Sequence, residues 1–333
     1  MVFVSIDDIV AIVQAVFFNP VIVLGYIFYL FRFNTSANDY EYILPQIWAI
    51  MLITYKLVQL VLDASRMTRL DRNLDVVAVT GGASGLGNDI CKLLALKKIK
   101  VAALDIVVPS PSKKIVGVSY YRCDVGNNEE VIRTLGNVER DLGQVTVLIN
   151  NAGIARRGTV LEMSLADVRE TVDVNFMAIY HTVKAVLSPM VIADRGYIVT
   201  VASSLGYQGP IEFAAYGATK SAAMSFHESL TYELASHRGI KTLLVVPGQM
   251  QTAMFSQISP PFQFFAPVVD PNELAKSIVH SLEVGRTGKL AAPFYVHVMP
   301  VIRALPEYVV SAFRWASGMD RVVRQSNIQN PTQ

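Results

Sequence analysis

The chain has 333 residues, enough for one enzyme-sized domain and an additional segment. Its 29 Lys and Arg residues nearly balance its 27 Asp and Glu residues, and a net charge of +2 argues against a nucleic-acid partner. Its two cysteines, Cys91 and Cys123, suggest neither a disulfide framework nor a metal site, and they fit a reducing compartment. The five histidines form no closely spaced set of metal ligands, so we expect no metal centre.

Residues 1–72 differ from the rest of the chain, and we predict that they anchor it to a membrane. The run from Ile9 to Phe31 contains no charged residue. Its polar or helix-breaking interruptions are Gln14, Asn19 and Pro20. As one helix, the run is long enough to cross a hydrocarbon core of about 30 Å. Asp7 and Asp8 stand where a signal peptide has basic residues, which argues against a cleaved signal.

A second apolar stretch runs from Ile43 to Leu62. Polar residues recur in and just after it at near-helical spacing: Gln46, Lys56, Gln59 and Asp63. This pattern suits a helix in the membrane interface or one packed against the first span, so one span and two spans are both open.

The positive residues around these stretches predict the orientation of the domain that follows. Arg66, Arg69 and Arg72 come after the second stretch, whereas the loop between the two stretches carries only Arg32. This bias predicts that the downstream domain faces the cytosol, from an intracellular membrane such as the endoplasmic reticulum or a lipid droplet surface.

From about residue 73 to residue 290, short apolar runs alternate with helical patterns such as 89–97. The runs are Val76–Val79, Val101–Leu104, Val145–Ile149, Tyr197–Val201 and Leu243–Val246. Uninterrupted apolar strands between helices predict a parallel sheet that is covered on both faces, a Rossmann-like, doubly wound, three-layer α/β/α fold. Ligands of such sheets bind at the carboxyl ends of the strands, where the polar clusters of this sequence fall.

A glycine-rich turn follows the first of these runs and opens a helix. Glycines there permit a tight turn and bring the backbone close to a pyrophosphate at the helix N-terminus. The residues of this predicted cofactor site are Gly81, Ser84, Gly85, Leu86 and Gly87.

Asp105 ends the second run, where a carboxylate binds the ribose hydroxyls of an adenosine and repels a 2′-phosphate. Ser84, Ile106 and Val107 supply no cation for such a phosphate, so we expect NAD rather than NADP. The alternative for Asp105 is a helix cap or an ordinary loop acid.

Five motifs occur in one characteristic order: the glycine turn, Asn150–Gly153, Ser203, Tyr216–Lys220 and Pro247–Thr252. In order and spacing they resemble the short-chain dehydrogenase/reductase family over residues 75–285. The resemblance implies an oxidoreductase that moves a hydride between NAD(H) and an alcohol or ketone carbon. With its hydrophobic N-terminus, the chain looks most similar to the membrane-associated branch of retinol and 17-beta-hydroxysteroid dehydrogenases. That likeness implies a lipophilic substrate of the retinoid, steroid or acyl-lipid class.

Tyr216 and Lys220 are four residues apart and share one face of a helix. An ammonium beside a phenol favours the phenolate and lowers the pKa of the tyrosine, so we expect Tyr216 to act as the acid/base. The family places its serine thirteen residues before the tyrosine, which selects Ser203 over the adjacent Ser204. By the same resemblance, Asn175 carries a water-linked proton relay to the lysine; its alternative is an ordinary buried polar group.

The resemblance also assigns the remaining contacts with the cofactor. Asp124 is expected to contact adenine and Asn151 the adenosine side. Lys220, beside Tyr216, is expected to hold the nicotinamide ribose, and Met250 and Thr252 the carboxamide. Family members commonly form homodimers or homotetramers, and we carry both over as expectations.

Two later segments leave alternatives open. The aromatic and proline-rich segment 260–267 is either a lid on a hydrophobic cavity, ordinary core packing, or a surface that dips into the bilayer. The apolar extension 291–333 is either membrane-associated, a cover for the core, or a dimer-stabilising tail. For the whole chain, the alternative to an enzyme is a catalytically silent NAD(H)-binding membrane protein that acts as a sensor or scaffold in lipid metabolism.

Overall fold

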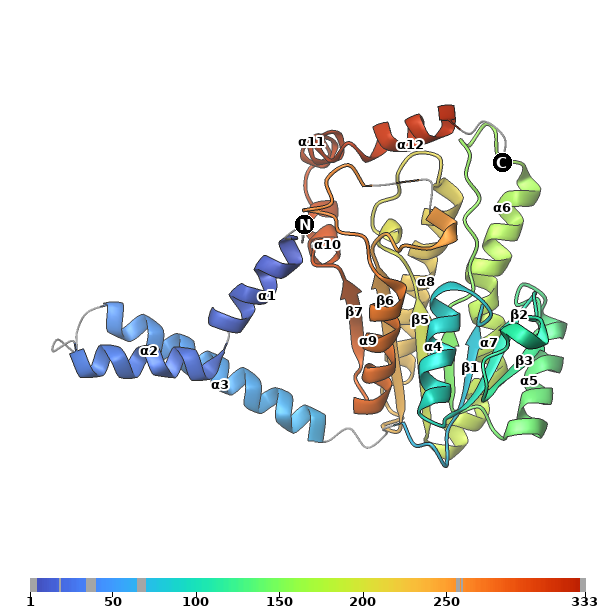
Figure 1. Cartoon of the computed structure of the whole chain (residues 1–333), viewed down its shortest axis with the longest axis horizontal. Coiled ribbons are helices and arrows are strands. Elements are labelled where there is room, and N and C mark those ends of the chain that lie inside the picture. The colour runs from blue at the N-terminus through green and yellow to red at the C-terminus, as the bar shows by residue number, and fades with distance from the viewer. Residues whose placement is uncertain are drawn as a thin grey trace. The chain divides into compact units, whose positions relative to one another are not determined.

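The computed structural model describes residues 5–17, 19–33, 40–64, 70–255, 258 and 260–329. The chain divides into two compact units, residues 1–66 and 67–333 (Figure 1). Arg66 and Arg69, on which the predicted orientation depends, lie outside the described residues.

The described residues of the N-terminal unit form the helices α1 (Ile6–Phe17), α2 (Pro20–Phe33) and α3 (Tyr40–Ala64). A new helix begins at Pro20 because the Asn19 side chain accepts a hydrogen bond from the Val21 amide at 3.0 Å and Pro20 takes the first helical position. The prediction of one continuous helix from Ile9 to Phe31 is therefore wrong. At about 1.5 Å per residue, α1 and α2 are each shorter than a hydrocarbon core of about 30 Å.

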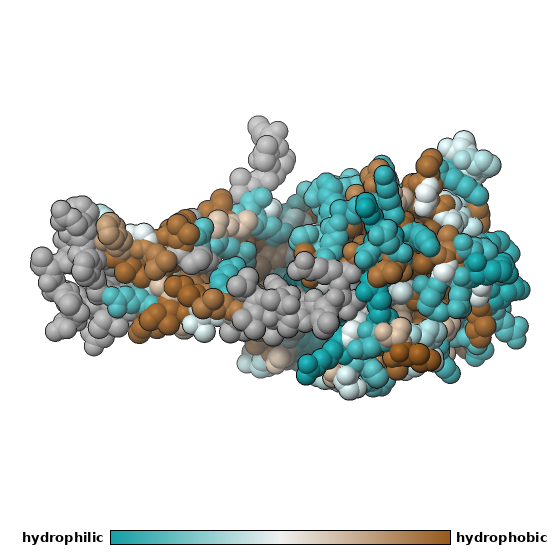
Figure 2. All heavy atoms as spheres, turned by 90° about the horizontal axis from the view of Figure 1, so that it is seen from below, coloured by the Kyte–Doolittle hydropathy of each residue, from teal (hydrophilic) through white to brown (hydrophobic). Residues whose placement is uncertain are grey.

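Helix α3 contains the second apolar stretch and has 25 residues, a length of about 37 Å. A small core joins it to α2 through Val23, Ala49 and Leu52. Large apolar side chains elsewhere on the unit are exposed, among them Ile50 and Leu57, and hydrophobic atoms cover much of its described surface in Figure 2.

The predicted polar stripe of α3 is described in part. Gln46 is half-buried and Lys56 is exposed, whereas the side chains of Gln59 and Asp63 lie outside the described part.

Among the described residues, one helical segment is long and apolar enough to cross a membrane, Leu165–Ala193. It belongs to the second unit, where Ile179, Val183 and Met190 pack into the core on one face of the sheet. A core helix passes this test of length and composition, so the segment adds nothing to the case for membrane attachment.

A seven-stranded sheet, parallel throughout, forms the centre of the second unit in the order β3-β2-β1-β4-β5-β6-β7. The strands are β1 (Val76–Thr80), β2 (Lys100–Asp105), β3 (Val118–Arg122), β4 (Val147–Asn150), β5 (Gly196–Val201), β6 (Ile240–Pro247) and β7 (Gly288–Ala292). Strand residues alternate between two cores. In β1, Val77 and Val79 face one core, and Val76 and Ala78 face the other.

Helices cover both faces of this sheet, as Figure 1 shows. One core is closed by α4 (Gly85–Leu96) and α9 (Pro271–Val284), and the other by α5 (Asn128–Leu142), α7 (Ala178–Ala193) and α8 (Ala214–Glu233). The predicted three-layer Rossmann-like fold is confirmed. The edge strands β3 and β7 were not among the predicted strands, since their half-exposed sequences lack a continuous apolar run.

The C-terminal segment folds into α10 (Tyr295–Arg303), α11 (Glu307–Ser317) and α12 (Met319–Gln329). Helices α11 and α12 lie at the top of the sheet unit in Figure 1, and α10 lies below them near the end of β7. Strand β7 runs across the boundary expected at residue 290. Shorter elements complete the unit: α6 (Leu165–Val172), a π-helical turn η2 (Asp173–Met177), and the 3-10 turns η1 (Pro111–Lys113), η3 (Ser204–Gly206) and η4 (Ala253–Phe255).

Candidate active site

The glycine turn connects the end of β1 at Thr80 to the start of α4 at Gly85. Gly81 and Gly85 have φ angles of +64° and +50°, which residues other than glycine rarely adopt. A Cβ on Gly87 would lie 2.1 Å from the carbonyl oxygen of Gly81, so this packing requires glycine. The first backbone amides of α4 lack intrahelical acceptors and the helix dipole favours an anion, so the turn fits a pyrophosphate.

The two other predicted residues of the turn differ in their surroundings. Ser84 occupies the N-cap position of α4 and makes no capping bond with its side chain. Leu86 points into the core, so it can meet a cofactor only through its backbone.

Two predicted acids lie at the carboxyl ends of strands. Asp105 accepts hydrogen bonds from the Ala83 amide and the Val107 amide, both at 3.0 Å, which joins the end of β2 to the glycine turn. Asp124 follows β3, is exposed, and accepts a hydrogen bond from the Gly126 amide at 2.9 Å. Both carboxylates therefore stand at the sheet edge expected for adenosine.

Asn151 ties the end of β4 to the same turn. Its side-chain amide donates to the carbonyl oxygens of Thr80 and Gly81 at 3.0 and 3.2 Å, and its backbone amide donates to the Thr80 hydroxyl at 2.9 Å. Asn151 thus holds the turn in shape. Thr80, its partner, was not predicted; the signal was its position directly before the first glycine.

Asn175 lies in the π-helical turn η2 and is almost fully buried. Its side chain clamps the backbone of Ile154, accepting from the amide at 2.7 Å and donating to the carbonyl at 2.8 Å, and it also donates to the Thr219 hydroxyl at 3.1 Å. A Cβ on Gly153 would lie 3.3 Å from Asn175 Oδ1 and 3.4 Å from Lys220 Nζ. The amide and the ammonium therefore converge on Gly153, and such π-turns are frequent at functional sites.

Ser203 and Tyr216 are brought together by the end of β5 and the start of α8. Their side chains share a hydrogen bond, and Ser203 Oγ also accepts from the Leu205 amide at 3.2 Å. Ser203, rather than Ser204, is thus the serine beside the tyrosine.

Lys220 lies one turn after Tyr216 on α8, with its Nζ 5.7 Å from the centre of the tyrosine ring. The ammonium is buried and donates to the carbonyl oxygen of Val201 at 3.1 Å. Burial disfavours the charged form and lowers the pKa of Lys220 to about 8.

The expected direction of the Tyr216 pKa is wrong in this structure. Burial raises the pKa of Tyr216 to about 12, and the hydrogen bond with Ser203 only opposes that rise. The reason is that the Lys220 ammonium binds the Val201 carbonyl, while the phenol lies in an apolar environment. At neutral pH Tyr216 is a protonated acid, the form that donates to a carbonyl oxygen.

Apolar side chains surround the tyrosine on its other sides. The Phe255 ring meets it edge-on at 5.7 Å between centroids, and Phe213, Ile258 and Val323 are buried in the same cluster. Val323 comes from α12, so the C-terminal extension covers Tyr216. Burial of an apolar group against such a surface is favourable.

The segment after β6 brings Met250 and Thr252 to the same edge. Met250 pairs with Val269 in an isolated bridge, and the Thr252 amide donates to the Met250 carbonyl at 2.9 Å. A Cβ on Gly85 would lie 4.0 Å from Thr252 Cγ2, which puts the threonine beside the start of α4.

The aromatic segment 260–267 does not pack into the core. Phe262, Phe264 and Phe265 are all exposed, and Phe264 and Phe265 contact each other edge-on. The core-packing alternative is therefore wrong for these rings, and the cover on Tyr216 comes from Phe255, Ile258 and α12.

The fold and this arrangement of serine, tyrosine and lysine define an oxidoreductase with a nicotinamide cofactor. A model of the short chain dehydrogenase family matches residues 75–261, and the chain belongs to that family.

Several curated relatives are similar to this chain. An uncharacterized oxidoreductase of Saccharomyces cerevisiae is 32% identical over 74% of this chain and 83% of its own length. Human epidermal retinol dehydrogenase 2 is 32% identical over 62% of this chain and 71% of its own. Carbonyl reductase family member 4 of Xenopus tropicalis is 33% identical over 62% and 91%.

Gly87→Ala is expected to abolish binding of NADH, because the added methyl group would displace the Gly81 carbonyl from the pyrophosphate turn. Fluorescence titration with NADH measures the loss. The matched control is Gly136→Ala in helix α5, where nothing lies within 4 Å of the new methyl group. That control should bind normally and gain about 0.5–1 kcal/mol of stability, measured by denaturant unfolding. Unchanged NADH binding by Gly87→Ala would contradict the assignment of the turn.

Proposed function

We propose that the protein is a membrane-attached, NAD(H)-dependent oxidoreductase that interconverts an alcohol and a carbonyl group on a lipophilic substrate. The observation that carries the proposal is the buried Tyr216 phenol, hydrogen-bonded to Ser203 and flanked by the Lys220 ammonium and by apolar side chains. A bound nicotinamide would supply or accept the hydride.

The residues of the chain handle the proton and the substrate oxygen. Ser203 donates a hydrogen bond to that oxygen and positions it against the Tyr216 hydroxyl. Tyr216 donates its proton to the oxygen during carbonyl reduction and takes it back during alcohol oxidation. The Lys220 ammonium stabilises the phenolate that forms, and Asn175, across Gly153 from it, belongs to the path by which the proton is replaced.

The surroundings of Tyr216 favour a lipophilic substrate. Phe213, Phe255, Ile258 and Val323 supply the apolar wall, and they offer nothing to a charged group. Retinoids, steroids and acyl lipids share an alcohol or ketone on a large apolar body, and human epidermal retinol dehydrogenase 2 is among the similar proteins.

Tyr216→Phe is expected to lower the turnover of a lipophilic aldehyde or ketone with NADH by about 100-fold or more, since it removes the acid that protonates the substrate oxygen. The measurement is NADH oxidation at 340 nm in detergent with a panel of retinoid, steroid and acyl substrates. Tyr232→Phe, on an exposed part of the same helix, is the control. Equal rates for Tyr216→Phe and the unmodified protein would disprove this mechanism, and NADH binding without turnover would favour a sensor or scaffold.

For the cofactor, we propose NAD rather than NADP because of Asp105. Its carboxylate is fixed beside the glycine turn by the amides of Ala83 and Val107. A fixed negative charge there accepts hydrogen bonds from ribose hydroxyls and repels a 2′-phosphate.

The unmodified protein should therefore bind NADH more tightly than NADPH, and Asp105→Ala should shift the ratio of the two dissociation constants toward NADPH by about tenfold, or about 1.4 kcal/mol. Fluorescence titration with each cofactor gives the ratio, and the exposed Asp141→Ala is the control. Tighter binding of NADPH by the unmodified protein would overturn the assignment.

Membrane attachment is proposed from the N-terminal unit, in which α3 has the length to cross a bilayer and presents exposed apolar side chains such as Ile50 and Leu57. The basic residues after α3 favour a catalytic domain on the cytosolic side of an internal membrane. The proposed sites are the endoplasmic reticulum and the lipid droplet.

The full chain should remain with membranes during alkaline carbonate extraction, whereas Ile50→Lys combined with Leu57→Lys should release it, because charges in the hydrocarbon core cost about 2.5–3.5 kcal/mol each. Ile132→Lys, an equally exposed position on helix α5, should have no effect. In sealed vesicles, external protease should digest the catalytic domain. Full protection of that domain would reverse the proposed orientation.

A further inference from the structure

The backbone between the catalytic serine and the catalytic tyrosine is held by side chains of the C-terminal segment. Arg303 of α10 donates to the Gly206 carbonyl at 3.2 Å, and Arg314 of α11 donates to the Gly209 carbonyl at 3.0 Å. Asp320 of α12 accepts from the Ile211 amide at 3.1 Å and pairs with Arg314. The segment is therefore bonded to this loop at three separate points.

Arg157, in the segment after β4, makes a fourth attachment and joins three elements. Its Nε pairs at 2.7 Å with Glu212, which directly precedes Phe213 and α8. Its other nitrogens donate to the Ser326 hydroxyl at 3.0 Å and to the Val323 carbonyl, both on α12. The pair is mostly buried, with 20% of the Arg157 side chain and 7% of the Glu212 side chain exposed, so solvent screens it weakly.

Helix α12 presents apolar side chains toward the apolar cluster that contains Tyr216. Val323 is fully buried in the cluster that contains Tyr216, and Met319 and Val322 pack against it. These residues enter a cluster that already contains Phe255 and Ile258 from the segment after β6. The apolar surroundings of the tyrosine are thus completed by the last helix of the unit.

We propose that α12 forms the outer wall of the substrate pocket and that Arg157 is the positioning residue that holds this wall against Tyr216. The inference rests on the proposed function and narrows its substrate class to compounds whose apolar body extends from the reacting carbon to α12. Short substrates that do not reach α12 would not depend on Arg157.

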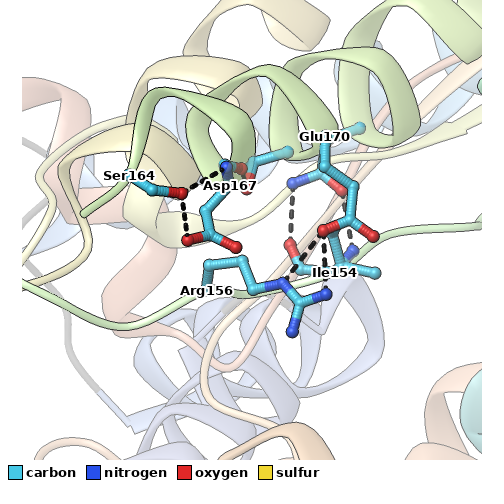
Figure 3. Close-up of polar contacts among 7 residues, drawn as sticks. Ile154, Arg156, Ser164, Asp167 and Glu170 are labelled. Carbon is cyan, nitrogen blue, oxygen red and sulfur yellow. Dashed lines mark hydrogen bonds and ion pairs between the residues drawn. The ribbon is translucent and has the colours of Figure 1, made fainter.

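The neighbouring Arg156 provides a matched control. It pairs with Glu170 on α6 at 2.8 Å, and about half of each side chain is exposed. Figure 3 shows this pair beside Ile154, with Ser164 and Asp167 at the start of the same helix. The two arginines are adjacent in the sequence, but only Arg157 is bonded to α12 among the contacts of the described residues.

The kinetic test compares hexanal with dodecanal, using the full chain in detergent with NADH. Arg157→Gln should raise KM for dodecanal by about tenfold, equivalent to about 1.4 kcal/mol, while KM for hexanal changes less than about twofold. Because the reacting groups are untouched, kcat should stay within about threefold for both aldehydes. Ser326→Ala, which removes one of the Arg157 contacts, should give a smaller change of the same kind. Arg156→Gln should leave KM and kcat unchanged for both aldehydes.

A second variant and a measurement without turnover complete the test. Val322→Trp should narrow the pocket and reduce kcat/KM for dodecanal more than for hexanal. Hydrogen–deuterium exchange of Arg157→Gln should rise in residues 206–213 and 319–326 and stay unchanged in residues 81–87.

The inference would be overturned if Arg157→Gln raised KM equally for the two aldehydes or left KM unchanged for both. It would also be overturned if Arg156→Gln raised KM for dodecanal as much as Arg157→Gln does. If the unmodified protein turns over neither aldehyde, the proposed function fails for this substrate class. The exchange measurement then decides alone whether Arg157 holds α12: increased exchange in 206–213 and 319–326 supports it, and unchanged exchange there refutes it.

Discussion

The catalytic domain keeps an ammonium group almost out of contact with water, and the site is shaped by that requirement. A buried cation is costly unless polar atoms surround it, and the lowered pKa of Lys220 reflects this cost. The Val201 carbonyl supplies one hydrogen bond at the end of β5, and the face of the Tyr216 ring lies close by. Any change that moves β5 relative to α8 would leave this charge without its partner.

The same requirement explains why Gly153 and Asn175 accompany the lysine. A side chain at residue 153 would press against both the ammonium and the Asn175 amide oxygen. The Asn175 side chain forms hydrogen bonds with Ile154 and Thr219. These bonds hold the segment after β4, which contains Ile154, against α8. The position of Lys220 beside Tyr216 thus depends on Gly153 and Asn175, which lie outside the pair.

The sequence was sufficient to predict the central strands of the sheet, and it also placed the predicted site residues at the carboxyl ends of those strands or in the helices that follow them. Buried parallel strands appear in the sequence as continuous apolar runs. The glycine turn, Ser203, Tyr216 and Lys220 belong to short motifs whose residue spacing can be read directly from the sequence. The sequence does not predict the edge strands β3 and β7, because their partly exposed residues interrupt the apolar pattern.

Other features depend on three-dimensional contacts that no local pattern contains. The contacts of Arg157 with α12 join residues more than 160 positions apart. The direction of the Tyr216 pKa cannot be predicted from spacing, because spacing shows the nearby Lys220 but not the burial that raises the pKa. The break at Asn19-Pro20 is visible in the sequence as an interruption, but the sequence does not show that the Val21 amide donates to the Asn19 side chain and so starts a new helix there.

The π-helical turn at Asp173–Met177 also limits how the gene can vary. A π-turn contains one residue more than an α-helical turn, which rotates all later residues by about 100°. That rotation lets Asn175 clamp Ile154 while Ile179 and Val183 of α7 still face the sheet. Loss of a single codon here would force a choice between the clamp and the core, so this long helix tolerates substitution far better than a change in length.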